Sequence, residues 1–200
     1  MRKPRRKAEE TREDILGKAE ELFRAQGFAK VSIADIASAL GMSPANVFKH
    51  FHTKTALAVA ITERHISRMT ERLANLDETV PPQERLLRVA QRLMESHLND
   101  LHQNPYIFEM VLMTADTDFP SGRLYKQLLE EKFESIVRAG VEAGFYCCPD
   151  PARSARAVTA ALVGVLHPAL LKRAGCGELD ERCEILVDLI NAALQNPLAK

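Results

Sequence analysis

Hydrophobic residues recur along this chain with the spacing of an α-helix almost from end to end. Ile33, Ile36, Ala37 and Leu40, for example, stand at i, i+3, i+4 and i+7, which places one apolar stripe on a helix. No segment sustains the period-two alternation of a half-buried strand. The pattern predicts an all-α protein of about nine helices, with approximate bounds 15–26, 32–40, 44–51, 53–76, 83–103, 106–115, 122–143, 150–174 and 179–194.

Helix-boundary residues define a short two-helix unit between residues 32 and 51. Ser32 precedes the first apolar stripe and Asp35 follows three residues later, which resembles the spacing of a capping box. Gly41 stands where this helix ends, at a position that often needs a positive φ. Ser43 and Pro44 then supply an N-cap hydroxyl and a proline at the first helical position. These signals predict two helices joined by a tight turn.

The second helix of this unit has one apolar face and one polar face. Val47 and Phe51 are four residues apart and turn toward the first helix. The residues left pointing outward are Ala45, Asn46, Lys49 and His50. This is the pattern of a helix-turn-helix, whose second helix enters the major groove of DNA. Asn46, Lys49 and His50 are the expected base-reading residues, because amide and ammonium groups bond to the edges of adenine and guanine.

Hydroxyl groups and one ammonium around this unit are placed to hold DNA phosphates. Ser32, Ser43 and Thr53 are expected to do so through their hydroxyls, although each can equally serve as a helix cap, and Lys54 through its charge. The predicted set of DNA-binding residues combines these four with residues of the second helix. It is Ser32, Ser43, Pro44, Ala45, Asn46, Phe48, Lys49, His50, Thr53 and Lys54.

Several further motifs occur around this unit in a fixed order. They are Ala19-x-x-Leu22-Phe23 on a helix, Gly27-Phe28 in a turn, the helix-turn-helix itself, and Phe51-His52-Thr53-Lys54 before a long helix. In this order the chain resembles the TetR/AcrR family of bacterial repressors, from Thr11 to about Ala60. The family usually has tyrosine where this chain has Phe48, and phenylalanine lacks the hydroxyl that commonly touches a phosphate. Lys49 or His50 is expected to compensate for it.

The resemblance also implies what the rest of the chain does. Residues 1–55 would form the DNA-binding domain, and residues 56–200 a body that binds a small, largely apolar effector and dimerises through its last two helices. A homodimeric repressor of this kind binds a near-palindromic operator in double-stranded DNA. The residues expected to line the effector cavity are Met94, His97, Leu101, Phe108, Met113, Tyr125, Phe133 and His167. Any single one of them fits an ordinary hydrophobic core equally well.

Charge is divided unevenly along the chain although its formal net charge is zero. Residues 1–55 contain eleven Lys and Arg against seven Asp and Glu, a net of +4, so the remainder carries 16 against 20, a net of −4. A basic N-terminal part followed by an acidic remainder suits a protein that binds nucleic acid through its N-terminal part only. The basic arm, residues 1–8, is expected to follow the minor groove or the phosphates, unless it is simply solvated.

Other classes of protein find no support in the sequence. The basic N-terminus runs into a charged helix rather than an apolar segment, and the most apolar stretch, 157–171, is too short to span a membrane, so a cytoplasmic protein is expected. Cys147, Cys148, Cys176 and Cys183 have no zinc-binding spacing and are expected to be free thiols. No hydrolase, phosphate-loop or metalloprotease motif is present. We therefore expect neither an enzyme nor a metal or organic cofactor.

Two alternatives remain open at this point. One is an architectural DNA-binding protein, whose body serves only for assembly and has a filled core. The other is an adaptor regulated by a protein partner that docks on an exposed apolar patch of the body.

Overall fold

The computed structural model describes residues 8–71, 80–115, 118–173 and 176–196, and in these residues the only regular elements are helices. The eleven helices are α1 (Ala8–Gln26), α2 (Ile33–Ala39), α3 (Pro44–Phe48), α4 (Lys54–Glu71), α5 (Pro82–Gln103), α6 (Pro105–Met113), α7 (Pro120–Glu142), α8 (Pro151–Ala161), α9 (Val163–Leu166), α10 (Pro168–Leu171) and α11 (Cys176–Gln195). The prediction of an all-α fold is confirmed. None of these helices, within the segments just given, is long and apolar enough to cross a lipid bilayer.

The count exceeds nine because the predicted helix 150–174 is divided into three. Asp150 caps α8 as predicted, by accepting a hydrogen bond from the backbone N–H of Arg153 at 2.9 Å. The chain then bends at Leu162 and again at His167, whose backbone is extended (ψ 123°). Pro168 explains the second break, because proline disfavours helical geometry in the residue before it. The single long helix was therefore wrong.

Two other bounds differ from the prediction. The helix predicted over 53–76 is described as α4 up to Glu71, and its predicted end lies outside the described residues. The last helix begins at Cys176, three residues earlier than expected.

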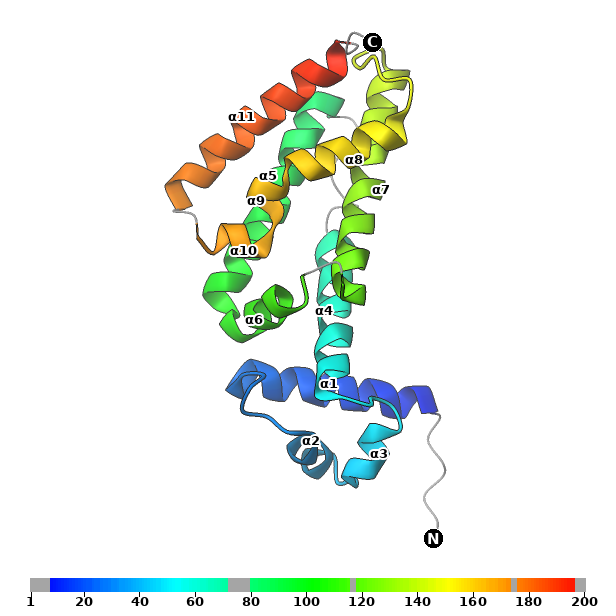
Figure 1. Cartoon of the computed structure of the whole chain (residues 1–200), viewed down its shortest axis with the longest axis vertical. Helices are drawn as coiled ribbons and strands as arrows, with labels where there is room; N and C mark the ends of the chain where they lie inside the picture. Colours follow the sequence, from blue (N-terminus) through cyan, green and yellow to red (C-terminus); the bar gives the residue numbers. More distant parts are fainter. Residues whose placement is uncertain (1–7, 72–79, 116–117, 174–175, 197–200) are drawn as a thin grey trace.

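The molecule is elongated, with α1, α2 and α3 forming a head at one end (Figure 1). Helix α4 leads from the head into the body, where α5 and α7 lie beside it and α8 crosses over them (Figure 1). Helix α11 lies on an outer edge of the body, against α5 and the α8–α9 segment. The head is thus joined to the body by one continuous helix.

The head has its own hydrophobic core, and that core extends beyond residue 55. Phe23, Ile36 and Val47 are fully buried at its centre. Leu57 and Ile61 of α4 belong to the same cluster, as do three residues of α6, namely Ile107, Met110 and Val111. The first turns of α4 and one face of α6 therefore hold the head against the body.

The core of the body is a second cluster, contributed by helices from α4 to α11. Leu86, Leu93 and Phe133 are fully buried in it, and Met94 packs beside them. The apolar stripes predicted for 83–103 and 122–143 face this cluster, which explains why α5 and α7 remain long and regular.

Candidate functional site

The turn between α2 and α3 forms as the sequence predicts. The backbone N–H of Asp35 donates to Ser32 Oγ at 3.2 Å, and the N–H of Ser32 donates to Asp35 Oδ2 at 2.8 Å, which completes a capping box. The Ser32 hydroxyl, which donates to Asp35 Oδ2 at 2.6 Å, and the Ser32 backbone N–H hold the pKa of the Asp35 carboxyl below its usual value. Gly41 has φ +62°, a conformation that L side chains rarely adopt. The start of α2 and the turn that follows it are therefore set by local interactions.

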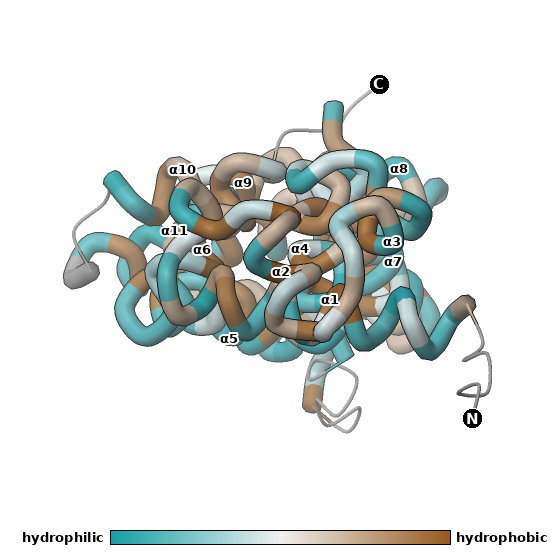
Figure 2. The backbone as a smooth tube through the Cα atoms, turned by 90° about the horizontal axis from the view of Figure 1, so that it is seen from below, coloured by the Kyte–Doolittle hydropathy of each residue, from teal (hydrophilic) through white to brown (hydrophobic). Residues whose placement is uncertain are grey.

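Helix α3 presents one face outward at the end of the molecule seen in Figure 2. Val47 and Phe51 are buried in the head core, as predicted. Ala45, Phe48 and Lys49 are exposed, together with Pro44, while Asn46 and His50 are half-buried. The helix is shorter than expected and ends at Phe48, so Lys49 and His50 lie in the turn that follows it. The predicted base-reading residues thus share one accessible surface, which we call the α3 surface (residues 43–50).

The three hydroxyl residues near this surface are not equivalent. Ser32 uses its hydroxyl within the capping box, and Thr53 Oγ1 accepts a hydrogen bond from the N–H of Ala56 at 3.0 Å, which caps α4. Ser43 occupies the N-cap position of α3, but its hydroxyl makes no capping bond there. Ser43 is also exposed, so its hydroxyl is available to a ligand such as a phosphate.

Lys54 is bound within the head in this structure. Its ammonium donates to the carbonyl oxygens of Phe28 at 2.7 Å, Val31 at 3.0 Å and Ala29 at 3.4 Å, and lies 4.3 Å from the centre of the Phe28 ring. An ammonium has three donors, and all three are used inside the head. Lys54 therefore ties the loop after α1 to the start of α4, and its contact with a DNA phosphate stays a prediction.

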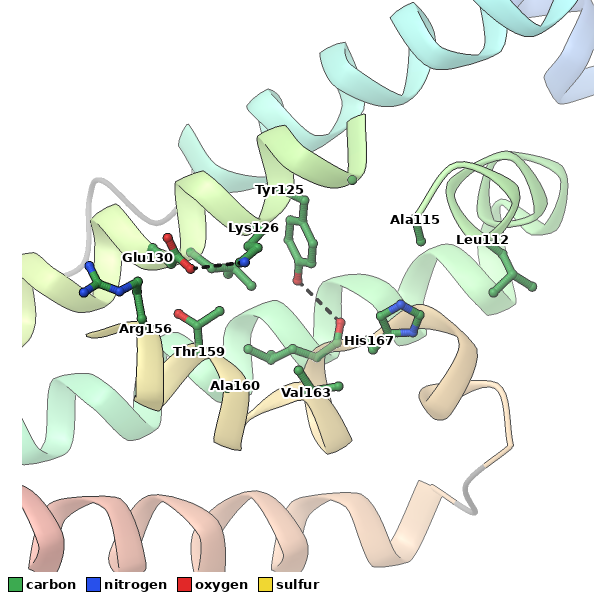
Figure 3. A pocket seen from close by; sticks show the side chains of 13 residues that line it. Leu112, Ala115, Tyr125, Lys126, Glu130, Arg156, Thr159, Ala160, Val163 and His167 are labelled. Atoms are coloured by element: carbon green, nitrogen blue, oxygen red, sulfur yellow. Dashed lines mark hydrogen bonds and ion pairs between the residues drawn. The ribbon is translucent and has the colours of Figure 1, made fainter. Parts of the chain in front are cut away.

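The body contains a pocket of about 620 Å³ between α7, α8 and α9, reaching the end of α6. Its volume is in the range of small-molecule sites, about 300–1,000 Å³. Figure 3 shows the side chains that line it. They are Leu112, Ala115, Gly122, Tyr125, Lys126, Leu129, Glu130, Arg156, Thr159, Ala160, Val163, Leu166 and His167.

Only part of the predicted cavity lining is found at this pocket. Tyr125 and His167 line it. The other six predicted residues are not among its lining residues, and their contact with an effector stays a prediction: Met94, His97, Phe108 and Phe133 are buried, Leu101 is half-buried and Met113 is exposed. A helical period shows that a residue faces inward, but it does not show whether a neighbouring side chain or an empty space faces it.

Sequence reasoning missed the polar lining residues of α7 and α8. Acidic and basic residues are mixed around Lys126 and Glu130, a sequence pattern that by itself indicates a solvated helix face. Arg156, Ala160 and Val163 stand at i, i+4 and i+7 on the α8–α9 segment, and this shared spacing was the available signal.

A buried polar pair adjoins the pocket. His97 Nε2 lies 2.8 Å from the hydroxyl of Tyr125, and the two rings meet edge to face with centroids 5.4 Å apart. Burial lowers the pKa of His97 to about 4, so its imidazole is neutral at physiological pH. Burial also raises the pKa of Tyr125. The pair is therefore an uncharged hydrogen bond between α5 and the pocket wall.

From this pair, polar contacts continue to the head. Asp100 lies one turn after His97 on α5, and its Oδ2 is 2.6 Å from His65 Nε2 on α4. The amide of Asn104 donates to Asp100 Oδ1 at 3.4 Å, and Arg24 of α1 donates to Asn104 Oδ1 at 2.6 Å. We call this set of residues the polar chain: Tyr125, His97, Asp100, His65, Asn104 and Arg24. Its printed contacts form two groups, Tyr125 with His97 and Asp100 with His65, Asn104 and Arg24, which are connected through one turn of α5.

Comparison with protein families assigns both parts of the chain. Residues 15–61 match the family described as "Bacterial regulatory proteins, tetR family". Residues 82–187 match the family described as "Tetracyclin repressor-like, C-terminal domain". The second match alone covers more than half of the 200 residues.

Among curated proteins, the probable HTH-type transcriptional regulator ArpR of Pseudomonas putida is 31% identical over 100 residues, which are 47% of this chain and 48% of ArpR. The HTH-type transcriptional regulator TtgR of Pseudomonas putida is 30% identical over 100 residues, with the same two coverages. The chain thus spans about half the length of these relatives.

Solved structures agree in fold. A TetR-family transcriptional regulator from Pectobacterium atrosepticum superposes with a TM-score of 0.68 at 22% identity, over 99% of both chains. Thermus thermophilus FadR, a TetR-family repressor solved with lauroyl-CoA, superposes with a TM-score of 0.67 at 20% identity, over 94% of this chain and 96% of FadR. The chain belongs to the TetR family, whose members are DNA-binding transcriptional regulators and not enzymes.

Proposed function

We propose that this protein is a repressor that leaves a near-palindromic operator when a small, largely apolar effector enters the pocket of Figure 3. TetR-family regulators bind DNA and small molecules and function as dimers. Such a protein acts on the chromosome, so we place it in the cytoplasm. On the α3 surface, Asn46, Lys49 and His50 would contact bases and Ser43 a phosphate. Residues 1–7 of the basic arm lie outside the described residues.

The observation that carries this proposal is the polar chain between the pocket and the head. A ligand that displaces the Tyr125 hydroxyl would disturb its 2.8 Å contact with His97. One turn further along α5, Asp100 holds α4 through His65, and Asn104 holds α1 through Arg24. A shift of α5 would therefore move α4, which joins the body to the head, and α1, which belongs to the head.

Release of DNA requires that the effector prefers one arrangement of the heads. A dimer binds two half-sites tightly only when its two recognition helices match the repeat of the major groove. An effector that binds better to a mismatched spacing lowers operator affinity, typically by about 1–3 kcal/mol. The architectural alternative lacks this coupling.

For the dimer contact we propose the outer face of α11 and the adjoining α8–α10 segment. Ile185 is 53% exposed and Leu189 is 64% exposed, although both are large apolar residues of one helix. Leu170 of α10 is also a large exposed apolar residue. Ile190, next to Leu189 on α11, is only 8% exposed and packs inside the protomer. Replacing Leu189 by glutamate is thus a better test of the dimer than replacing Ile190.

The experiment couples ligand binding to operator release. The operator is first selected from random duplexes, and a metabolite library is then screened for compounds that raise the melting temperature of the protein. A compound bound in the pocket should weaken operator binding by about 5–150-fold. Asp100→Asn should still bind the compound, but it should release the operator less completely, with Glu131→Gln on the outer face of α7 as a matched control. Compounds that bind the pocket without changing operator affinity would instead favour the architectural alternative.

A further inference from the structure

We propose that the ligand of this pocket is an amphipathic anion, with an apolar body along the pocket and one carboxylate-type end held by Arg156. The inference rests on the proposed function only in taking this pocket as the effector site. It names the chemical class of the ligand, which neither the family nor the relatives assign.

The charged residues of the pocket gather at one end of it (Figure 3). Lys126 and Glu130 form an ion pair at 3.8 Å, so each partially neutralises the other. Arg156 stands beside them, and among the described residues no hydrogen bond or ion pair is found for its guanidinium. Two cations and one carboxylate leave this end with a net charge of +1. An arginine with five unused donors is the side chain that best matches a carboxylate or phosphate.

The polar groups elsewhere in the pocket also favour a ligand that accepts hydrogen bonds. His167 Nδ1 accepts a hydrogen bond from the N–H of Ala169 at 3.2 Å, so the neutral ring carries its proton on Nε2. That N–H is a donor on the pocket wall. The hydroxyl of Thr159 donates to the carbonyl of Ala155 at 2.9 Å and is thereby occupied within α8. Arg156 and His167 therefore both offer hydrogen-bond donors to a ligand in this pocket.

Apolar side chains make up much of the remaining wall. They include Leu129, Ala160, Val163 and Leu166, and Leu112 lies at the far end from Arg156 (Figure 3). An apolar ligand body gains free energy by covering this surface. A ligand that covers Arg156 would, however, remove water from its guanidinium. This desolvation costs free energy unless the ligand supplies an opposite charge. A cationic ligand would meet a net positive end, and a neutral one would leave the guanidinium unpaired.

The test is direct binding of three probes that share one chain and differ in the end group: octanoate, octanol and octylamine. Binding to the full-length protein without DNA is measured by calorimetry and checked by native mass spectrometry. Octanoate should bind at least about tenfold more tightly than octanol, since a charge-assisted hydrogen bond contributes that much or more. Octylamine should bind more weakly than octanol.

Matched variants locate the effect at Arg156. Arg156→Gln should reduce the preference for octanoate over octanol to less than about threefold, while Arg156→Lys should retain most of it. Arg153→Gln, an exposed arginine of α8 that does not line the pocket, should behave as the unchanged protein. Because Arg156 is exposed, these variants are expected to keep the fold, and circular dichroism verifies this.

Three results would overturn the proposal: octanol or octylamine binding as tightly as octanoate, no binding of octanoate at all, or an unchanged preference in Arg156→Gln. Operator release is measured separately. If octanoate binds as expected through Arg156 and the operator stays bound, the ligand class is supported and the proposed regulatory function fails. If a neutral or cationic compound enters the pocket and releases the operator, the function is supported and the anionic class fails.

Discussion

The head and the body of this protein use their polar groups in opposite ways. In the head, polar side chains close the ends of backbone segments: Ser32 and Asp35 cap α2, and Lys54 binds three carbonyl groups after α1. In the body, polar side chains are buried against one another beside an open pocket, as in the pair of His97 and Tyr125. The head is therefore held in one shape by bonds from side chains to its backbone, whereas the body has a pocket beside its polar pair.

This difference suits a division of labour between recognition and response. A DNA-reading surface must keep its geometry, because base contacts depend on exact positions in the groove. A ligand-responsive body needs at least two arrangements that differ little in free energy. The following predictions test whether the two regions are separable in this sense.

The largest expected effects come from removing one buried aromatic ring in each core. Phe23→Ala in the head and Phe133→Ala in the body should each lower the free energy of unfolding by about 3–5 kcal/mol, because both rings are fully buried. Denaturant titration measures this loss. Among the molecules that remain folded, Phe23→Ala should no longer bind the operator, whereas Phe133→Ala should still bind it. Equal loss of operator binding in both variants would show that the two regions form one cooperative unit.

Replacing two lysines of the head, one at a time, should separate an effect on the free energy of unfolding from an effect on DNA binding. Lys54→Met removes three hydrogen bonds from a charged donor and should lower the free energy of unfolding by about 2–3 kcal/mol. Lys49→Met changes an exposed residue and should stay within about 0.5 kcal/mol of the parent, yet weaken specific operator binding by about 1–3 kcal/mol. A Lys54→Met protein of unchanged stability and weak DNA binding would instead support the predicted phosphate contact of Lys54.

In the body, stability should depend on pH through His97. Its folded-state pKa is lowered from 6.5 to about 4 by burial, so below the unfolded value the unfolded chain binds a proton that the folded protein does not. Stability is therefore present at neutral pH and lost as the pH falls from about 6.5 toward 4. Between neutral pH and about pH 5 the loss from this group is ~2 kcal/mol. The free energy of unfolding of His97→Gln should show a shallower pH dependence over the same window, and an identical slope would contradict the assignment.

The smallest effects distinguish two serines that precede helices of the head. Ser32→Ala removes the capping box of α2 and should cost about 1 kcal/mol of stability. Ser43→Ala should stay within about 0.5 kcal/mol, because this hydroxyl makes no capping bond. If Ser43 holds a phosphate, its loss should weaken binding to operator and random duplexes alike. A Ser43→Ala variant with unchanged affinity for both would remove Ser43 from the interface.

What the sequence determined by itself was local. The capping pair Ser32 and Asp35, the positive φ of Gly41 and the N-cap Asp150 each depend on residues within about one helical turn, and all three occur as predicted. The helical period likewise predicted that Val47 and Phe51 face inward. The helix-turn-helix could be predicted because such short-range interactions specify it almost completely. The break before Pro168 was equally local and was missed, although the proline itself was visible in the sequence.

Only the tertiary structure decided which surfaces meet. A period of 3.6 residues gives a helix a buried face but does not say what covers it, so Phe133 became core while Tyr125, eight residues earlier, lines the pocket. Ile190 packs inward and Leu189 outward for the same reason. The three carbonyls bound by Lys54 and the position of Arg156 beside Glu130 depend on loops and helices that meet across the fold. Pockets form where helices diverge, and the angles between helices are set by the packing of the whole core.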